Sequence, residues 1–255
     1  MSEAPPDPLA QIFRDAHRIL FVTGAGLSAD SGLPTYRGVA GLYENRDADI
    51  PVEVAMSGPM FERHPEVTWR HIRVIEEAGR TAEPNPGHAA IAALEHHREV
   101  VVLTQNVDGL HARAGSSRVI EIHGNALRLR CTGCAWTDRV SDYTHLPPLP
   151  RCERCSGVVR PDVVLFEEML PAGAVADLRR ELLAGFDAVV SVGTSSLFPY
   201  ISEPVLRAAA AGTPTAEINP ADTDLSGFVA LRVRERAAVA LQRAFAAFEA
   251  LEGSA

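Results

Sequence analysis

Four cysteines, the only ones in the chain, have the spacing of ligands to a structural metal ion. Cys131, Cys134, Cys152 and Cys155 form the pattern C-x2-C-x17-C-x2-C. Two thiolate pairs at this spacing can close a tetrahedral zinc site with no open coordination position. Another soft metal is the alternative, because thiolates also bind other soft ions. The pattern therefore predicts a zinc ribbon that supports the fold, with the chemistry elsewhere.

A glycine-rich turn follows the first strongly apolar run of the chain. The run Ile19–Val22 leads into Gly24-Ala25-Gly26-Leu27-Ser28-Ala29, which fits the phosphate-binding pattern G-x-G-x-x-G/A. Glycines there let backbone N–H groups approach a pyrophosphate. No strand ends in an acidic residue about twenty positions later, where a dehydrogenase holds the ribose hydroxyls. The turn thus favours nucleotide binding and disfavours hydride transfer.

Polar clusters follow three further apolar runs, at 104–111, 193–196 and 218–220. Polar side chains at the carboxyl ends of parallel strands point into the crevice where open α/β sheets bind ligands. The first cluster has a simpler alternative, a helix cap and turn built from Asn106, Asp108 and Gly109. Together with the glycine turn, the clusters predict one extended nucleotide cleft.

The elements that must position these clusters alternate between strand and helix. Continuous apolar runs predict buried parallel strands, and they lie at 19–22, 100–103, 119–122, 163–166, 188–192 and 214–218. Amphipathic patterns with caps or glycine stops predict helices, at 66–77, 89–95, 178–183, 205–211 and 237–251. The chain is therefore predicted to be α/β, with a Rossmann-like parallel sheet and helices on both faces.

Two stretches interrupt this alternation and predict a small domain. Residues 36–79 contain a loop and a helical insertion, and residues 124–159 contain the cysteines and a proline-rich turn. The remaining segments, 1–35, 80–123 and 160–255, are predicted to form a discontinuous Rossmann-like domain that binds the nucleotide.

Composition limits the partners and the chemistry. The 255 residues carry a net charge of -9, which disfavours nucleic acid and anionic membranes as partners. All 24 basic residues are arginine, so no lysine can serve as a phosphate ligand or Schiff base. The N-terminus lacks a signal-peptide pattern, and no run is long enough to span a membrane. The cysteines need a reducing compartment, so a cytoplasmic location is expected.

The motifs occur in the order found in a known enzyme family. Residues 24–38, 105–108, 123–124, 193–195 and 218–219, together with the four cysteines, resemble the sirtuins, which are NAD-dependent protein-lysine deacylases. The resemblance covers roughly residues 18–220. It implies that the chain transfers an acyl group, most simply acetyl, from a lysine side chain to ADP-ribose. Nicotinamide and 2'-O-acyl-ADP-ribose are then released, NAD is consumed, and zinc is structural.

The resemblance also implies roles for individual residues. His123 matches the general base, for which an imidazole pKa near neutrality is suited, and Asn106 joins it as a catalytic residue. The residues implied to bind NAD are Gly24, Ala25, Gly26, Asp30, Tyr36, Arg37, Gln105, Asn106, Val107, Asp108, Gly193, Thr194, Ser195 and Asn219. Those implied to contact an acyl-lysine protein or peptide are Val164, Phe166 and Glu167.

Several positions depart from the family pattern. Ile72 and Ile75 stand where members that remove acidic acyl groups carry tyrosine and arginine, so desuccinylation is not expected. Glu167 replaces the glycine of the peptide-pairing segment, and Tyr36 replaces a phenylalanine. The segment Ser196–Tyr200 also differs from the commoner sequence.

Some alternatives remain open. The same cleft could serve an ADP-ribosyltransferase or an NAD glycohydrolase, or it could bind NAD as a sensor without consuming it. His123 could have only a structural role, as a hydrogen-bonding partner at the end of a strand. Arg37 could form a surface ion pair. The other histidines, such as His96 and His97, are expected to face solvent.

Overall fold

The structure, a computed structural model, describes residues 7–34 and 50–253. Its strands are β1 (Arg18–Thr23), β2 (Glu99–Thr104), β3 (Val119–Glu121), β4 (Gly124–Cys131), β5 (Thr137–Arg139), β6 (Val159–Val163), β7 (Ala188–Val192), β8 (Thr215–Ile218) and β9 (Leu231–Val233). Its helices are α1 (Pro8–Asp15), α2 (Ala25–Ser28), α3 (Val52–Ala55), α4 (Gly58–Arg63), α5 (Pro65–Gly79), α6 (Pro86–Leu94), α7 (Leu110–Ala114), α8 (Ala172–Ala184), α9 (Pro199–Ala210) and α10 (Ala237–Glu252). A short 3-10 turn, η1 (Ala29–Ser31), follows α2.

Six strands form one parallel sheet in the order β3-β2-β1-β7-β8-β9. Its central strands are almost entirely buried, because helices cover both faces and β-branched and aliphatic residues fill the pleat. The chain runs from β1 outward to β2 and β3, and later returns to β7 on the other side of β1. This reversal creates a crevice at the carboxyl ends of β1 and β7, where sheets of this kind bind ligands.

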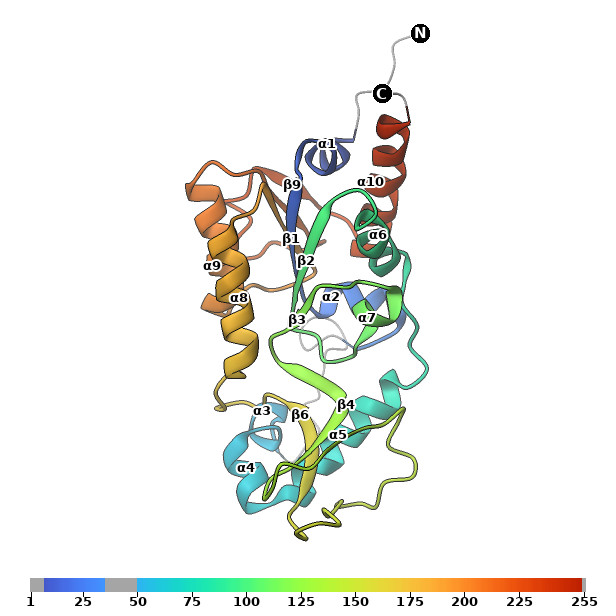
Figure 1. The fold of residues 1–255 in the computed structure, drawn as a ribbon, viewed down its shortest axis with the longest axis vertical. Coiled ribbons are helices and arrows are strands. Elements are labelled where there is room, and N and C mark those ends of the chain that lie inside the picture. Colours follow the sequence, from blue (N-terminus) through green and yellow to red (C-terminus); the bar gives the residue numbers. More distant parts are fainter. Residues whose placement is uncertain (1–6, 35–49, 254–255) are drawn as a thin grey trace.

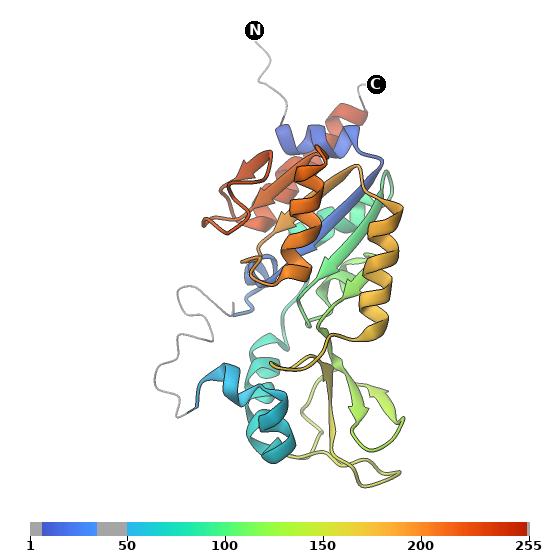
Figure 2. The same cartoon turned by 90° about the vertical axis from the view of Figure 1, so that its left-hand side faces the viewer.

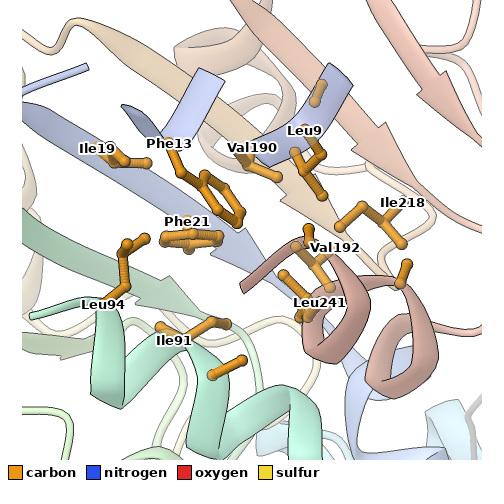
Figure 3. Close-up of a cluster of buried hydrophobic side chains, with 14 of the residues drawn as sticks. Leu9, Phe13, Ile19, Phe21, Ile91, Leu94, Val190, Val192, Ile218 and Leu241 are labelled. Atoms are coloured by element: carbon orange, nitrogen blue, oxygen red, sulfur yellow. The ribbon is translucent and has the colours of Figure 1, made fainter. Parts of the chain in front are cut away.

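Two hydrophobic clusters hold the helices against this sheet. On one face, α1, α6 and α10 pack over Phe21, Val190 and Val192 (Figures 1 and 3). On the other face, α8 and α9 pack over Leu20 and Val22 (Figure 1). Each fully buried aliphatic or aromatic side chain contributes about 1.5–3 kcal/mol. The predicted α/β class, with helices on both faces of a parallel sheet, is confirmed.

Helix ends follow the signals in the sequence. Asn85 caps α6: its side chain accepts hydrogen bonds from the backbone N–H groups of Gly87 and His88, and Pro86 occupies the first turn. Gly185 ends α8 with a φ of 82°, and Gly212 follows α9 with a φ of 74°. Only glycine adopts such angles at little cost.

The second lobe lies beyond the carboxyl ends of the large sheet (Figures 1 and 2). An antiparallel sheet in the order β5-β4-β6 packs beside α3, α4 and α5. Trp69 of α5 is fully buried and donates from Nε1 to the carbonyl of Val159 at 2.9 Å. Its ring meets that of Tyr143 at 5.5 Å between centroids. The two predicted insertions, separated in sequence, therefore share one hydrophobic cluster.

One strand prediction is wrong. The apolar run at 163–166 does not join the large sheet; instead β6 pairs antiparallel with β4 in the small sheet. Beyond β6, Val164 donates its N–H to the carbonyl of His123, and Phe166 forms a bridge with Ser57. An apolar run shows that a segment is buried but not which sheet it joins. The short strand β9 was not anticipated. Among the described residues, no helix has the length and apolar character needed to cross a membrane.

Candidate active site

The turns that follow β1 and β7 pack backbone against backbone. Gly24 donates its N–H to the carbonyl of Val192 at 3.0 Å, and Gly26 donates to the carbonyl of Gly193 at 2.8 Å. A Cβ on Gly26 would lie 2.7 Å from the Cα of Gly193. Gly193 itself has a φ of 58°, and a Cβ there would lie 2.5 Å from the nitrogen of Leu27. Glycine is therefore required in both turns so that they can meet.

Hydrogen bonds between side chains join the turn after β1 to the segment after β2. Asn106 donates from Nδ2 to the carbonyl of Gly24 and to the hydroxyl of Ser28, both at 3.0 Å. Ser28 donates in turn to Oδ2 of Asp108 at 2.7 Å. Burial raises the pKa of Asp108, and hydrogen bonds from Leu110 and Ser28 oppose this. Asn106 and Asp108 are thus held in fixed positions across the crevice.

The segment after β7 is tied to both of its neighbours through Thr194. Gln105 donates from Nε2 to the hydroxyl of Thr194 at 2.6 Å, and Asn219 donates from Nδ2 to its carbonyl at 3.1 Å. The four clusters that the sequence analysis placed at strand ends therefore come together in one crevice, as predicted.

His123 lies between the large sheet and the small lobe, just after β3. Its Nδ1 is 3.1 Å from the carbonyl oxygen of Gln105, and its Nε2 is 2.7 Å from the hydroxyl of Tyr200. Burial lowers the pKa of His123, although the bond to Gln105 opposes this. The ring is therefore neutral near pH 7. With a proton on Nδ1 facing the carbonyl, the neutral ring presents Nε2 as a proton acceptor.

One cavity of about 980 Å³ joins these groups, which is near the upper end of the roughly 300–1,000 Å³ range of ligand pockets. Every described residue that the sequence analysis assigned to catalysis, cofactor or substrate lines this cavity. Tyr36 and Arg37 lie outside the described residues. Asp30 also lines the cavity, but its two carboxylate oxygens accept from Nε of Arg236 at 2.6 Å and from the N–H of Ala238 at 2.9 Å. It therefore also anchors the start of α10.

The segment assigned to the substrate has an unusual backbone. Glu167 is exposed and has a φ of 68°, one of three described non-glycine residues with positive φ. The next residue, Glu168, holds the segment through Arg160, whose Nη2 donates to Oε2 at 3.0 Å. The guanidinium of Arg160 is also 4.7 Å from the ring centre of Phe61. Arg160 thus ties the segment to the small lobe, a role that no sequence motif signalled.

The small-lobe end of the cavity is largely apolar. Ile72 and Ile75 of α5 line it, together with Val52, Met56 and Leu127. The described arginines of the lining are already paired: Arg80 with Glu76, Arg113 with Glu83, and Arg236 with Asp30. This end is therefore suited to an uncharged group.

The four cysteines gather in the small lobe, outside the lining of the cavity. Their sulfur atoms all lie within 4.8 Å of one another, with 3.4 Å between Cys131 and Cys155 and 3.7 Å between Cys134 and Cys152. Disulfide sulfurs would be about 2.05 Å apart, whereas ligands of a tetrahedral zinc ion are about 3.8 Å apart given Zn–S bonds of about 2.3 Å. The donor set fits a closed zinc site, and none of its members lines the cavity.

Two histidines contradict the expectation that histidines other than His123 face solvent. His88 and His111 are 0% and 2% exposed, and their rings meet edge to face with 4.9 Å between centroids. Burial lowers the pKa of His88 to about 4 and that of His111 to about 3. His88 sits in the capping box of α6, which is the one sequence signal that could have indicated its burial.

Comparisons with known proteins agree with this geometry. A family model described as the Sir2 family matches residues 24–198. The NAD-dependent protein deacylase 2 of Pseudomonas aeruginosa is 52% identical over 241 residues, which cover 92% of this chain and 94% of that protein. The structure of a Sir2 homolog–NAD complex has a TM-score of 0.87 at 32% identity, with 95% and 93% of the two chains covered. A Sir2–p53 peptide–NAD+ structure has a TM-score of 0.80 at 27% identity, with 96% of each chain covered.

Proposed function

Because the chain belongs to the Sir2 family and is an NAD-dependent protein deacylase, we propose that NAD and an acylated lysine meet in the cavity beside His123. The observation that supports this placement is that hydrogen bonds join the three strand-end segments to one another, and one of these segments holds His123 through the carbonyl of Gln105. The rest of the cavity lining then divides into two parts. The nucleotide would bind at the carboxyl ends of the strands of the large sheet, and the acyl group would bind in the small lobe.

The nucleotide would lie across the reversal between β1 and β7. Gly24, Gly26 and Gly193 bring no side chain to the crevice where the two turns meet, which suits close approach of a pyrophosphate. Asn219 would bind the adenosine ribose, and Gln105, Asn106 and Asp108 would surround the reacting half of the dinucleotide. When bound, NAD would supply the electrophilic ribose carbon from which nicotinamide departs as the leaving group.

His123 would act as the general base. Its Nδ1–H is committed to the carbonyl of Gln105, so Nε2 carries the lone pair that takes a proton from a ribose hydroxyl. The lowered pKa keeps this nitrogen unprotonated near neutral pH. Asn106, buried and anchored to Gly24 and Ser28, would keep the reacting groups in register.

The acyl group should be uncharged, and acetyl is the activity we propose first. A succinyl carboxylate at Ile72 and Ile75 would meet apolar side chains, and the described arginines that line the cavity already have partners. An unpaired buried charge costs several kcal/mol. Neutral acyl groups carry no such cost.

Location and partners follow from general chemistry. The four free thiols support a reducing compartment, for which we propose the cytoplasm. The net charge of -9 favours basic protein segments over nucleic acids or anionic membranes as partners.

Mass spectrometry of the products tests the proposal. The protein would be incubated with NAD and matched acetyl-, butyryl-, long-chain- and succinyl-lysine peptides, with His123→Ala as the control. We expect free lysine peptide, nicotinamide and 2'-O-acyl-ADP-ribose from the neutral acyl peptides, and little product from the succinyl peptide. Release of nicotinamide without deacylation would instead indicate ADP-ribosyl transfer or NAD hydrolysis. Absence of NAD consumption would indicate a sensor or an acyl substrate outside the panel.

A further inference from the structure

The segment that departs from the family pattern after β7 places an aromatic pair against His123. Tyr200 lies in the first turn of α9, and its ring stacks on that of Phe198 with 5.4 Å between centroids and 12° between planes. Both rings meet the imidazole edge to face, at 5.8 Å for Tyr200 and 6.1 Å for Phe198. Neither residue has a role in the account above.

The direction of the hydrogen bond between Tyr200 and His123 follows from the other side of the imidazole. The Gln105 carbonyl can only accept, so the Nδ1 atom 3.1 Å away carries the proton. In a neutral ring Nε2 is then an acceptor, and the Tyr200 hydroxyl 2.7 Å away is the donor. Burial raises the pKa of Tyr200 to about 12, so the hydroxyl keeps its proton throughout the neutral range.

We infer that Tyr200 is a positioning residue that holds the proton-accepting nitrogen of His123 until a ribose hydroxyl of the bound nucleotide displaces it. The inference rests on the proposed role of His123 as the base. Nε2 has one lone pair. While it accepts a hydrogen bond from the Tyr200 hydroxyl, it cannot also accept one from a ribose hydroxyl. Nucleotide binding must therefore break this hydrogen bond.

The surroundings allow such a displacement. Tyr200 is only half-buried, and Phe198 beside it is 41% exposed. Within the described part of the chain, the Tyr200 hydroxyl makes no hydrogen bond other than the one to His123. Rotating the hydroxyl away thus costs one neutral hydrogen bond, which corresponds to about a 2- to 12-fold change in an equilibrium constant.

Calorimetric binding of two nucleotides tests the inference. ADP-ribose carries the second ribose that would reach His123, and ADP lacks it. Tyr200→Phe removes the hydroxyl and keeps the ring. We expect it to bind ADP-ribose about 2- to 12-fold more tightly than the wild type, with the affinity for ADP unchanged. The matched control is Ser202→Ala, which removes a hydroxyl of the same helix that bonds to the backbone carbonyl of Phe198 and not to His123, and which should change neither affinity.

Kinetics provide a second readout. The KM for NAD in Tyr200→Phe should fall with no loss of kcat, a split that a merely structural role would not produce. Unchanged or weaker binding of ADP-ribose by a folded Tyr200→Phe protein would overturn the inference. Failure of the wild-type protein to bind ADP-ribose or consume NAD would instead refute the proposed function, so the two failures are distinguishable.

Discussion

The buried pair His88 and His111 predicts a steep loss of stability in mild acid. Both rings are shielded from solvent, and in the described structure one nitrogen of each, Nε2 of His88 and Nδ1 of His111, has no hydrogen-bond partner. The other nitrogens are used: His111 Nε2 lies 2.9 Å from the Thr23 hydroxyl, and His88 Nδ1 accepts from the N–H of Asn85 at 3.3 Å. Protonation would place two like charges side by side in a buried site, where only Asp30 favours the charge on His88, and burial outweighs it.

The size of the effect follows from the pKa values. In the folded protein they are about 4 for His88 and about 3 for His111, against 6.5 in an exposed histidine. Between these values the unfolded chain binds more protons, so stability is fully present above pH 6.5 and falls as the pH drops. Between pH 7 and pH 5, each ring lowers the free energy of unfolding by roughly 2 kcal/mol, and the pair lowers it by about 4 kcal/mol. Domains are typically stable by only about 5–15 kcal/mol.

Denaturant unfolding at pH 7 and pH 5 measures this loss. Between pH 7 and pH 5, both the wild type and His111→Gln should lose free energy of unfolding. We expect the loss in His111→Gln to be smaller than the wild-type loss by about 2 kcal/mol. His96→Gln, which removes an exposed histidine, should match the wild type. Carboxylates and the zinc thiolates are common to all three proteins, so their contributions cancel. An identical loss in His111→Gln and wild type would refute the reasoning.

Three further predictions concern the metal, the glycine turns and the base. Cys152→Ala should lose zinc and cooperative folding together, because one ion would bind both cysteine pairs of the small lobe. Metal analysis and thermal unfolding measure these losses, and a well-folded zinc-free variant would contradict the prediction. Gly26→Ala should cost about 1–3 kcal/mol of stability and weaken NAD binding, because its Cβ meets the backbone of Gly193; Gly173→Ala, with open space around it, is the control for thermal unfolding and NAD titration. Because burial lowers the pKa of His123 and the neutral ring is the active form, kcat/KM for NAD should decline in acid with a midpoint below pH 6.5; a midpoint above that pH would contradict the assignment.

The sequence predicts the strands of the large sheet well where apolar residues run without interruption. β1, β2 and β7 are bounded by polar or glycine residues and are buried on both sides, so periodicity and length agree. The cysteine set is equally clear, since its spacing allows few other structures, and its sulfur atoms do cluster. The division of the chain at residues 35, 79, 123 and 159 stays a prediction, and β6 extends across the last of these boundaries.

What the sequence could not indicate depends on contacts between distant segments. The run at 163–166 is apolar because Leu165 and Val163 pack in the hydrophobic cluster of the small lobe, not because it is a strand of the large sheet. The edge strand β9 is only three residues long and contains an arginine, so its pattern resembles a loop. His88 and His111 meet across a gap of 23 positions (111 minus 88), and Tyr200 meets His123 across 77. No local pattern indicates such pairs.

The most direct test of the account separates binding from turnover at His123. His123→Ala would be compared with wild type in NAD titration by calorimetry and in single-turnover deacetylation of an acetyl-lysine peptide. We predict that NAD affinity changes by less than about tenfold while the deacetylation rate falls by roughly 10²–10⁴-fold, the usual contribution of a general base. Deacetylation by His123→Ala at the wild-type rate would contradict the placement of the reaction beside this residue.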